Sequence, residues 1–349
     1  VMKHLTLRGP ADPLARRIVE ALAVALRRSG SSLEQAATAA FKAAADQQSL
    51  RWLDDLKGKV MADVTGANVA VENLSHALGL LPDLVSAGEA IPKLMPFLVA
   101  TQPVEIQTIA LEALTAFRNE PEVARTLIGS WKSLSPALRE KALSAFLSYP
   151  DRITALLGAL EAKDIPAAQI STSTRALLTK NKDKMIAERA AKIFGDGASG
   201  ARKDVITKYE AALRSEGDAA RGSKIYELVC MVCHRYKDRG NDVGPNLGTI
   251  QAWTPDQLLT NILDPNREVS PNFALYIIET NDGRTLTGLI ASETAGNLIV
   301  KRPDGGAEEV LRTDIKSLTS PGISLMPEGL EAAITPQQMA DLMAYLRQP

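Results

Sequence analysis

Two cysteines and a histidine at a fixed spacing constrain this chain more than any other feature. Cys230 and Cys233 enclose Met231 and Val232, and His234 follows at once, which makes a C-x-x-C-H run. This is the attachment spacing of c-type haem. The two thiols lie one helical turn apart, so each can form a thioether to a haem vinyl group, and the imidazole reaches the iron from the same face. The sequence therefore predicts one covalently bound haem c.

Two other interpretations of this run are open. One is a C-x-x-C redox pair that happens to precede a histidine, and the other is half of a zinc site. The chain has only 2 cysteines and 3 histidines, and His4 and His76 lie far upstream. Because these two histidines fall in a region of helical pattern, four zinc ligands would be hard to assemble. The composition favours haem over both alternatives.

The segments around the run resemble the class I cytochrome c family. A G-P-N-L segment at 244–247 begins ten residues after His234, and S-L-M-P at 324–327 precedes a terminal amphipathic pattern. The resemblance implies that the carbonyl of Pro245 accepts a hydrogen bond from His234. It also implies that Trp253 donates to a haem propionate, for which the alternative is a core tryptophan.

The predicted helices agree with this resemblance. Asp218 can cap a helix that runs into the haem run. In the family, a glycine and an aromatic at the offsets of Gly222 and Tyr226 meet the terminal helix. That helix opens with a T-P-Q-Q capping box at Thr335, and a similar T-P-x-Q start at Thr254 predicts a middle helix.

Met326 is the predicted sixth ligand of the iron. A thioether suits an electron carrier and raises its reduction potential, whereas an open site favours ligand binding or catalysis. Met231 lies inside the attachment run, while Met339 and Met343 are spaced as core residues of a helix. Met326 precedes a proline, which favours extended backbone, and the family places its methionine just before the last helix. A gap-filling core methionine is the alternative.

One stretch departs from a plain cytochrome. His234 and Met326 are 92 residues apart, and the excess reads as a β-insert at about 273–318. Alternating or apolar runs separated by N-D-G and P-D-G-G turns predict strands at 273–280, 284–292, 298–302 and 307–311. This small β-meander would shield the haem edge, form a docking surface, or simply stabilise the long loop.

The combined motifs narrow the resemblance. The segments VGPNL, NDGRTLTGLI, RTDI and SLMPEGL, followed by ITPQQMADLMAYL, resemble the C-terminal haem-binding domain of multidomain proteins from planctomycetes and verrucomicrobia. There the domain often follows helical repeats and a propeller thought to be a sugar or alcohol dehydrogenase. The resemblance implies an electron carrier rather than an enzyme, with a partner or fused dehydrogenase as donor and a downstream acceptor.

The pattern of the first two hundred residues predicts a domain of a different kind. A weak repeat recurs at Pro103, Pro136 and Pro166, at intervals of 33 and 30 residues, and each proline precedes a pair of helical patterns. Pairs of that period favour a HEAT-like α-solenoid, with an irregular helical bundle as the alternative. The predicted fold is thus mainly α. It comprises a repeat domain at 1–198, a linker helix at 199–216, and a monohaem class I cytochrome c-like domain with the β-insert at 217–349.

Charge and hydropathy restrict the kinds of partner that the chain can have. Residues 217–349 carry 12 Lys and Arg against 17 Asp and Glu, a net charge of −5, and the remainder carries a net charge of +4. Neither half is basic enough to suggest a nucleic acid, and no apolar run approaches a membrane span. Residues 1–10 do not resemble a signal peptide. Because thioether attachment takes place outside the cytoplasm, we expect a processed chain or a fragment, located in the periplasm or cell envelope.

Two further functions are open. A haem peroxidase would have Met326 displaced and a five-coordinate ferric iron. A gas or redox sensor would pass a change of haem ligation through the helical repeats to a partner. The sequence lacks a distal His and Arg pair near the run, which argues against the peroxidase, whereas nothing in it excludes the sensor.

Overall fold

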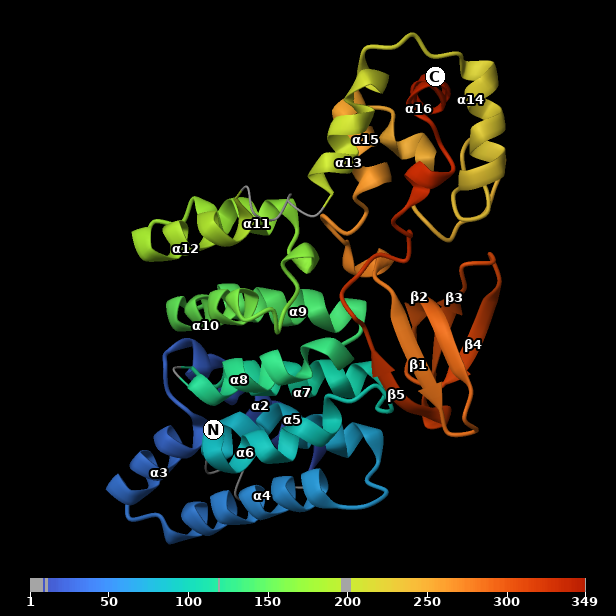
Figure 1. Ribbon diagram of the computed structural model, residues 1–349. Helices are drawn as coiled ribbons and strands as arrows, with labels where there is room; N and C mark the ends of the chain where they lie inside the picture. The colour runs from blue at the N-terminus through green and yellow to red at the C-terminus, as the bar shows by residue number, and fades with distance from the viewer. Residues whose placement is uncertain (1–8, 10–11, 119, 196–201, 349) are drawn as a thin grey trace. The chain divides into compact units, whose positions relative to one another are not determined.

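The computed structural model describes residues 9, 12–118, 120–195 and 202–348 (Figure 1). The chain divides into two compact units, residues 1–130 with 141–145, and residues 131–140 with 146–349. The predicted boundary at 198 therefore falls inside the second unit, among residues that the structure does not describe. The assignment of separate repeat and haem domains stays a prediction.

The first unit is built from helices. Consecutive helices pack on one another, α3 on α4, α4 on α5, and α5 on both α6 and α7. Apolar spacing in the sequence predicts helices at Pro13–Arg28 and Leu33–Ala45 and near Val71–Leu81 and Ile91–Leu98. It misses α4, whose charged residues cover a stripe of buried ones that includes Trp52, Leu56 and Val60. The helices are α2 (Pro13–Arg28), α3 (Leu33–Ala43), α4 (Gln47–Thr65), α5 (Val71–Leu84), α6 (Ala87–Leu94), α7 (Val104–Ala116) and α8 (Pro121–Ser130).

The helices that follow are α9 (Pro136–Leu147), α10 (Pro150–Glu161), α11 (Thr172–Thr179) and α12 (Lys184–Phe194). Residues of α9 belong to both units, and within the second unit α12 packs on α10 and on α11. The first of the two helical patterns that follow Pro166 covers 167–178 in the sequence, but the structure has a 3-10 turn at Ala167–Gln169 followed by α11. The break has a local cause, since the side chain of Ser171 accepts a hydrogen bond from the amide of Thr174 and starts a new helix. The regular solenoid stays a prediction.

The β-insert forms a five-stranded antiparallel sheet of order β4-β3-β2-β1-β5. The expected strands and turns are present, but the fifth strand was not predicted, and the sheet is therefore not a simple meander. After β4 the chain returns to pair with β1, where Ile278 lies opposite both Leu286 and Leu318. The strands are β1 (Tyr276–Thr280), β2 (Thr285–Glu293), β3 (Asn297–Lys301), β4 (Ala307–Leu311) and β5 (Ile315–Thr319).

The sheet is fastened to the helical segment at 131–139 of the same unit. The guanidinium of Arg139 lies 5.1 Å from the ring centroid of Tyr276 and 5.9 Å from that of Trp131. The hydroxyl of Tyr276 donates to the carbonyl of Leu134 at 3.3 Å, and the amide of Ser320 donates to the carbonyl of Lys132 at 2.9 Å. The insert is thus an integral layer of this unit.

The helices from residue 203 onward enclose a second apolar core. Capping boxes at Thr254 and Thr335 start α15 and α16, and the side chain of Asp218 caps α14, as the sequence predicts. Figure 1 shows α14 beside α16, with which it packs. The elements are α13 (Lys203–Tyr209), α14 (Ala219–Ile225), a π-helical turn at Tyr226–Cys230, α15 (Pro255–Leu263) and α16 (Pro336–Leu346).

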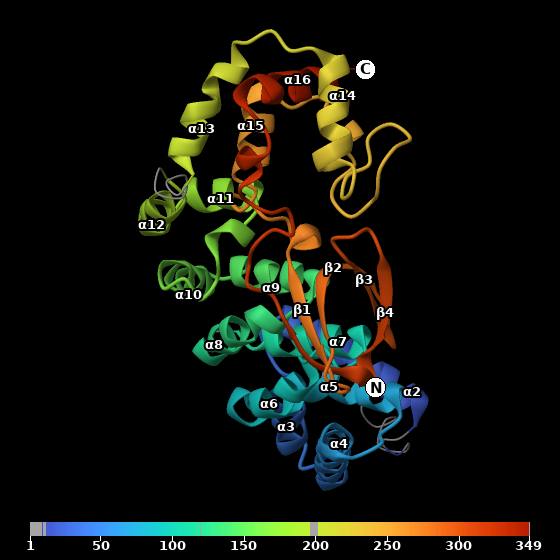
Figure 2. The ribbon, with the colours of Figure 1, turned by 45° about the vertical axis from the view of Figure 1, so that its right-hand side comes forward.

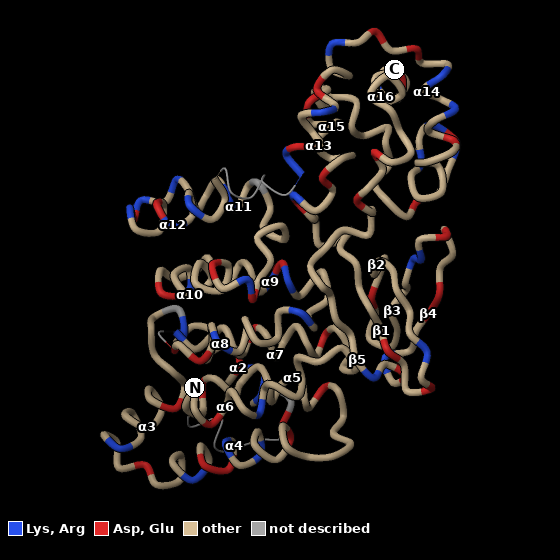
Figure 3. Tube along the Cα trace, viewed as in Figure 1, with Lys and Arg blue, Asp and Glu red and all other residues tan. Residues whose placement is uncertain are grey.

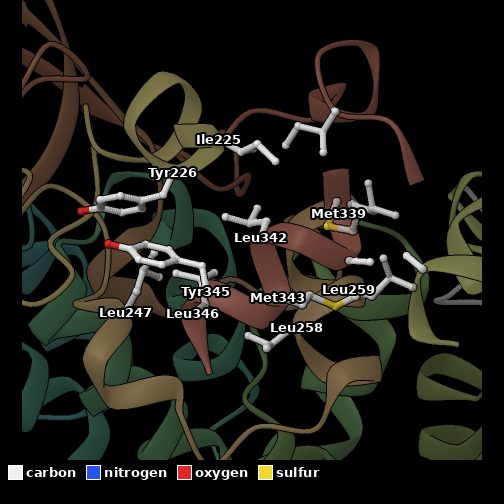
Figure 4. Close-up of a cluster of buried hydrophobic side chains, with 14 of the residues drawn as sticks. Ile225, Tyr226, Leu247, Leu258, Leu259, Met339, Leu342, Met343, Tyr345 and Leu346 are labelled. Atoms are coloured by element: carbon white, nitrogen blue, oxygen red, sulfur yellow. The ribbon is translucent and has the colours of Figure 1, made fainter. Parts of the chain in front are cut away.

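This core holds the attachment run in place. Figure 4 shows Leu342 and Met343 of α16 among apolar side chains from α14 and α15. Met339 and Leu342 are fully buried, which confirms that Met339 is a core residue. The predicted contact of Gly222 with the terminal helix is present, since a Cβ added at Gly222 would lie 2.0 Å from the carbonyl oxygen of Asp341.

Charges of both signs are interspersed along α14 and the loop that follows it (Figure 3). In the part of the chain that the structure describes, no helix combines the length and the hydrophobicity that crossing a membrane requires.

Candidate functional site

The attachment run lies where α14 ends. The π-helical turn at Tyr226–Cys230 carries the backbone into a tight turn, in which the amides of Cys233 and His234 donate to the carbonyl of Cys230 at 3.1 and 2.9 Å. This turn places both cysteines and the histidine on one short stretch, and neither thiol is in a disulfide.

The two thiols do not have the electrostatics of a redox pair. Burial, with the neighbouring Cys233 as a smaller contribution, raises the pKa of Cys230 to about 12. Burial also raises the pKa of Cys233. Reactive C-x-x-C motifs instead lower a thiol pKa to expose a thiolate at neutral pH. Both sulfurs are therefore protonated at neutral pH, which argues against the redox-pair interpretation.

His234 is oriented by Pro245. Its Nδ1 lies 2.8 Å from the carbonyl oxygen of Pro245, which has no proton to give, so Nδ1 is the donor. Burial lowers the pKa of His234, and the bond to Pro245 opposes this effect. The ring is therefore neutral at pH 7, with its lone pair on Nε2, the state in which an imidazole binds a metal. The structure has the geometry that the resemblance implies for these two residues.

Gly244 lies directly against the imidazole. A Cβ added at this position would lie 2.4 Å from Cε1, 2.8 Å from Nδ1 and 2.9 Å from Nε2 of His234. The amides of Val243 and Gly244 donate to the carbonyl of Cys233 at 3.0 and 2.7 Å. The G-P segment thus folds back over the histidine, and only glycine leaves room for the ring.

Tyr226 holds the backbone of the histidine. Its hydroxyl lies 2.7 Å from the carbonyl oxygen of His234 and 2.8 Å from that of Arg239. Figure 4 shows the ring of Tyr226 beside that of Tyr345, and their centroids are 5.7 Å apart. The sequence placed Tyr226 at the terminal helix, but this hydrogen bond could not be predicted because the hydroxyl partner is set by the tertiary fold.

These groups fit a covalently attached haem. Two unpaired thiols lie one turn apart, and a neutral imidazole beside them has Nδ1 occupied and Nε2 left as the ligand atom. Among the described residues, no group of three or more His, Cys, Asp or Glu side chains is placed to hold a metal ion. His76 contacts Glu20 in the first unit, and His4 lies outside the described residues.

Met326 lies in the segment between β5 and α16. The residue is half-buried, and its amide donates to the hydroxyl of Ser324 at 3.1 Å. Asn266, which follows α15 in the chain, holds this segment, because its Oδ1 accepts from the amide of Ser324 at 2.8 Å and its Nδ2 donates to Glu328 at 2.7 Å. No hydrogen bond joins Met326 to the described residues of the attachment run, and its role as an iron ligand stays a prediction.

Arg202 and Tyr209 hold the far end of the same segment. The guanidinium of Arg202 donates to the carbonyl of Leu263 and to the carboxylate of Glu331. The hydroxyl of Tyr209 donates to the carbonyl of Ile334 at 2.5 Å. These contacts carry no local sequence signal, because they join positions between 61 and 129 residues apart.

Trp253 precedes the cap of α15. It is 37% exposed, so it is not a fully buried core residue. Its amide donates to the carbonyl of Ile250 at 2.9 Å. The proposed donation from its indole to a haem propionate stays a prediction.

Comparison with known proteins gives one family. The model of the cytochrome c family matches residues 219–287, from the start of α14 into β2. The match includes Cys230, Cys233, His234 and Pro245 and leaves Met326 outside. Comparison with curated proteins gave no significant match. The family match, together with the geometry at His234, supports a c-type cytochrome domain in this part of the chain.

Proposed function

We propose that this chain is an electron-transfer protein with one covalent haem c, held by Cys230 and Cys233 and ligated by His234 and Met326. The haem supplies the one-electron redox step. The chain itself attaches the group, orients the imidazole and buries the surroundings of the iron.

The observation that carries this proposal is the bond between His234 Nδ1 and the carbonyl of Pro245 at 2.8 Å. It fixes the ring orientation and leaves Nε2 as the ring nitrogen whose lone pair can bind the iron. A hydrogen bond of this kind also raises the basicity of the ligand nitrogen.

The environments of the other methionines near the site support Met326 as the ligand. Met339 is fully buried and Met343 nearly so, and both belong to the core of α16. Met326 instead lies in a segment outside the helices and strands that is held on both sides, by Asn266 on one side and by Arg202 on the other. A tied loop presents a ligand at low entropic cost, because its backbone is ordered before the iron is bound.

The redox partners follow from the resemblance. We propose a dehydrogenase, fused or separate, as electron donor, a downstream acceptor protein, and a periplasmic or cell-envelope location. The acidic balance of residues 217–349 favours a basic surface on the partner.

Spectroscopy of the matured protein tests the axial ligands. The proposal predicts a low-spin haem with a thioether ligand in the full chain. Met326→Ala should abolish the thioether signature and lower the reduction potential, whereas Met185→Ala should leave both unchanged, because Met185 is 73% exposed on α12. Persistence of the thioether signature in Met326→Ala would refute the ligand assignment.

A redox or gas sensor is the second candidate, and one observation favours it. The segment that carries Met326 begins at Ser320, whose amide donates to Lys132 of the helical part of the same unit. A change of ligation at Met326 would therefore be felt at that helical segment. Reversible binding of carbon monoxide or nitric oxide, accompanied by altered amide exchange at 131–139, would favour the sensor.

A further inference from the structure

The turn between β3 and β4 lies against the haem attachment loop. The thiol of Cys233 is 3.5 Å from the carbonyl oxygen of Pro303, which it approaches as a donor. Figures 1 and 2 both show this end of the β3–β4 hairpin next to the loop that follows α14. Seventy residues of sequence separate the two groups, so their contact is a product of the fold.

Asn241 joins the two segments. Its backbone amide donates to the carbonyl of Met231 at 3.2 Å, and its side-chain Nδ2 donates to the carbonyl of Val232 at 2.9 Å. Both acceptors lie inside the C-x-x-C run. The same Nδ2 also lies against Gly305 of the β3–β4 turn, where an added Cβ would be 2.5 Å from it.

The hairpin is already ordered where it makes these contacts. Strands β3 and β4 pair over five residues, and Asp304 closes the turn by accepting from the amide of Gly306 at 2.9 Å. Gly305 has a φ of +86°, which a residue with a side chain rarely adopts. Lys301 adds a hydrogen bond to the carbonyl of Asp242. The hairpin therefore meets the loop at Cys233, Asn241 and Asp242.

We propose that the β3–β4 turn is a clamp on the haem attachment loop and that Asn241 is the positioning residue through which it acts. The proposal rests on the proposed function, because it gives the β-insert a role toward that same site. The clamp holds the C-x-x-C turn against the sheet and covers the Cys233 sulfur from the side of Pro303. The turn thereby prevents a redox partner from approaching the haem on the side of Pro303, and it reduces the access of water to the thioether at Cys233.

Paired variants of the matured full chain test the clamp. Asn241→Ala removes the bridge, and Asn281→Ala is the matched control, because Asn281 donates to Thr313 at the opposite end of the sheet. Loss of one hydrogen bond of about 1.4 kcal/mol corresponds to about a tenfold loss of protection in native-state amide exchange. Asn241→Ala should show this loss both at Val243 in the loop and at Gly305 in the turn, and Asn281→Ala at neither.

A second variant tests the clamp by a substitution in the sheet. Lys301→Ala should lower protection at Val243, which lies in the loop and not in the hairpin. Unchanged protection of the loop in both Asn241→Ala and Lys301→Ala would overturn the proposal. So would an equal loss in the Asn281→Ala control, because the effect would then be general loosening.

The reduction potential gives a readout that a purely structural role would not move. Greater solvent exposure near a haem favours the more charged oxidised state and lowers its potential. Asn241→Ala should therefore shift the potential downward relative to both the parent and Asn281→Ala, and an unchanged potential would contradict the clamp. A chain that carries no haem would sink the proposed function. A normal haem with an untouched loop and potential in Asn241→Ala would sink this inference alone.

Discussion

The hydroxyl oxygen of Tyr226 lies 2.7 Å from the carbonyl oxygen of His234, eight residues further along the chain. The ring of Tyr226 is fully buried and packs edge-on against Tyr236, with centroids 6.0 Å apart. One tyrosine thus links the aromatic core to the backbone of the predicted iron ligand. Tyr226, which precedes His234 in the chain, thus holds the backbone of this residue, while Pro245, which follows it, holds the ring.

Tyr226→Phe should destabilise the protein and loosen the histidine. The ring contacts survive, but the part-buried hydrogen bonds to the carbonyls of His234 and Arg239 are lost, so we expect the free energy of unfolding to fall by about 1 kcal/mol. Denaturant titration of the holoprotein measures this loss. Tyr276→Phe is the matched control, since its ring is also fully buried and its hydroxyl donates to Leu134 and not to the attachment loop. A haem spectrum that changes in Tyr276→Phe but not in Tyr226→Phe would contradict this account.

Gly244→Ala should displace the imidazole. The added methyl would meet three ring atoms of His234 at 2.4 to 2.9 Å, closer than non-bonded atoms approach, so the ring must move away from Pro245. We expect a shifted haem spectrum and a loss of stability in the range of about 1–3 kcal/mol that overpacking costs. Gly296→Ala, at a position with nothing within 4 Å of an added Cβ, should have neither effect. Equal behaviour of the two variants would show that Gly244 does not position the ring.

Asn266→Ala should loosen the segment that carries Met326. The variant removes the acceptor of the Ser324 amide and the donor to Glu328. We expect a fraction of the haem to lose its thioether signature, and each lost hydrogen bond to cost about 1 kcal/mol. The matched control is Asn261→Ala on α15, the helix that ends just before Asn266, because the side-chain amide of Asn261 donates to the carbonyl of Gln257. A full thioether signature in Asn266→Ala would show that this asparagine does not order the ligand loop.

Asp341 should make stability depend on acid pH. The hydrogen bond from Arg221 is the main cause that lowers the pKa of Asp341 to about 2, against an ordinary value of 3.8. Between these two values the unfolded chain binds more protons than the folded one, so stability falls as the pH drops from about 4 to 2. Above pH 4 this contribution is fully present.

Asp341→Asn cannot make this contribution. The parent should therefore be more stable than Asp341→Asn at pH 7, and the difference should shrink as the pH falls through the same window. Asp238→Asn, at an exposed position of the loop after α14, is the control. Thermal unfolding at pH 7, 4 and 3 checks the trend, and a difference that stays constant with pH would refute the assignment.

Local sequence signals predicted the elements around the site because their causes are local. The capping boxes at Thr254 and Thr335 start helices within the same three residues that carry the signal. The turn residues N-D-G at 281–283 and P-D-G-G at 303–306 likewise set the two hairpins. The pairing of His234 with Pro245 came from the family resemblance, and the structure has the same contact.

The remaining features depend on contacts between distant segments. Strand β5 is a five-residue stretch of weak alternation that becomes a strand because β1 offers it a free edge. Helix α4 was missed because its charged residues mask the apolar stripe. The clamp of Pro303 and Asn241 on the C-x-x-C run leaves no trace in the spacing of either segment. Its residues are ordinary turn residues until the sheet brings them to the loop.

The most direct test of the central claim is denaturing mass spectrometry of the chain after expression in a host that matures c-type cytochromes, combined with thiol alkylation. The account predicts a mass increased by one haem that persists on unfolding, with Cys230 and Cys233 both closed to alkylation. An unmodified mass with two alkylatable thiols would contradict it.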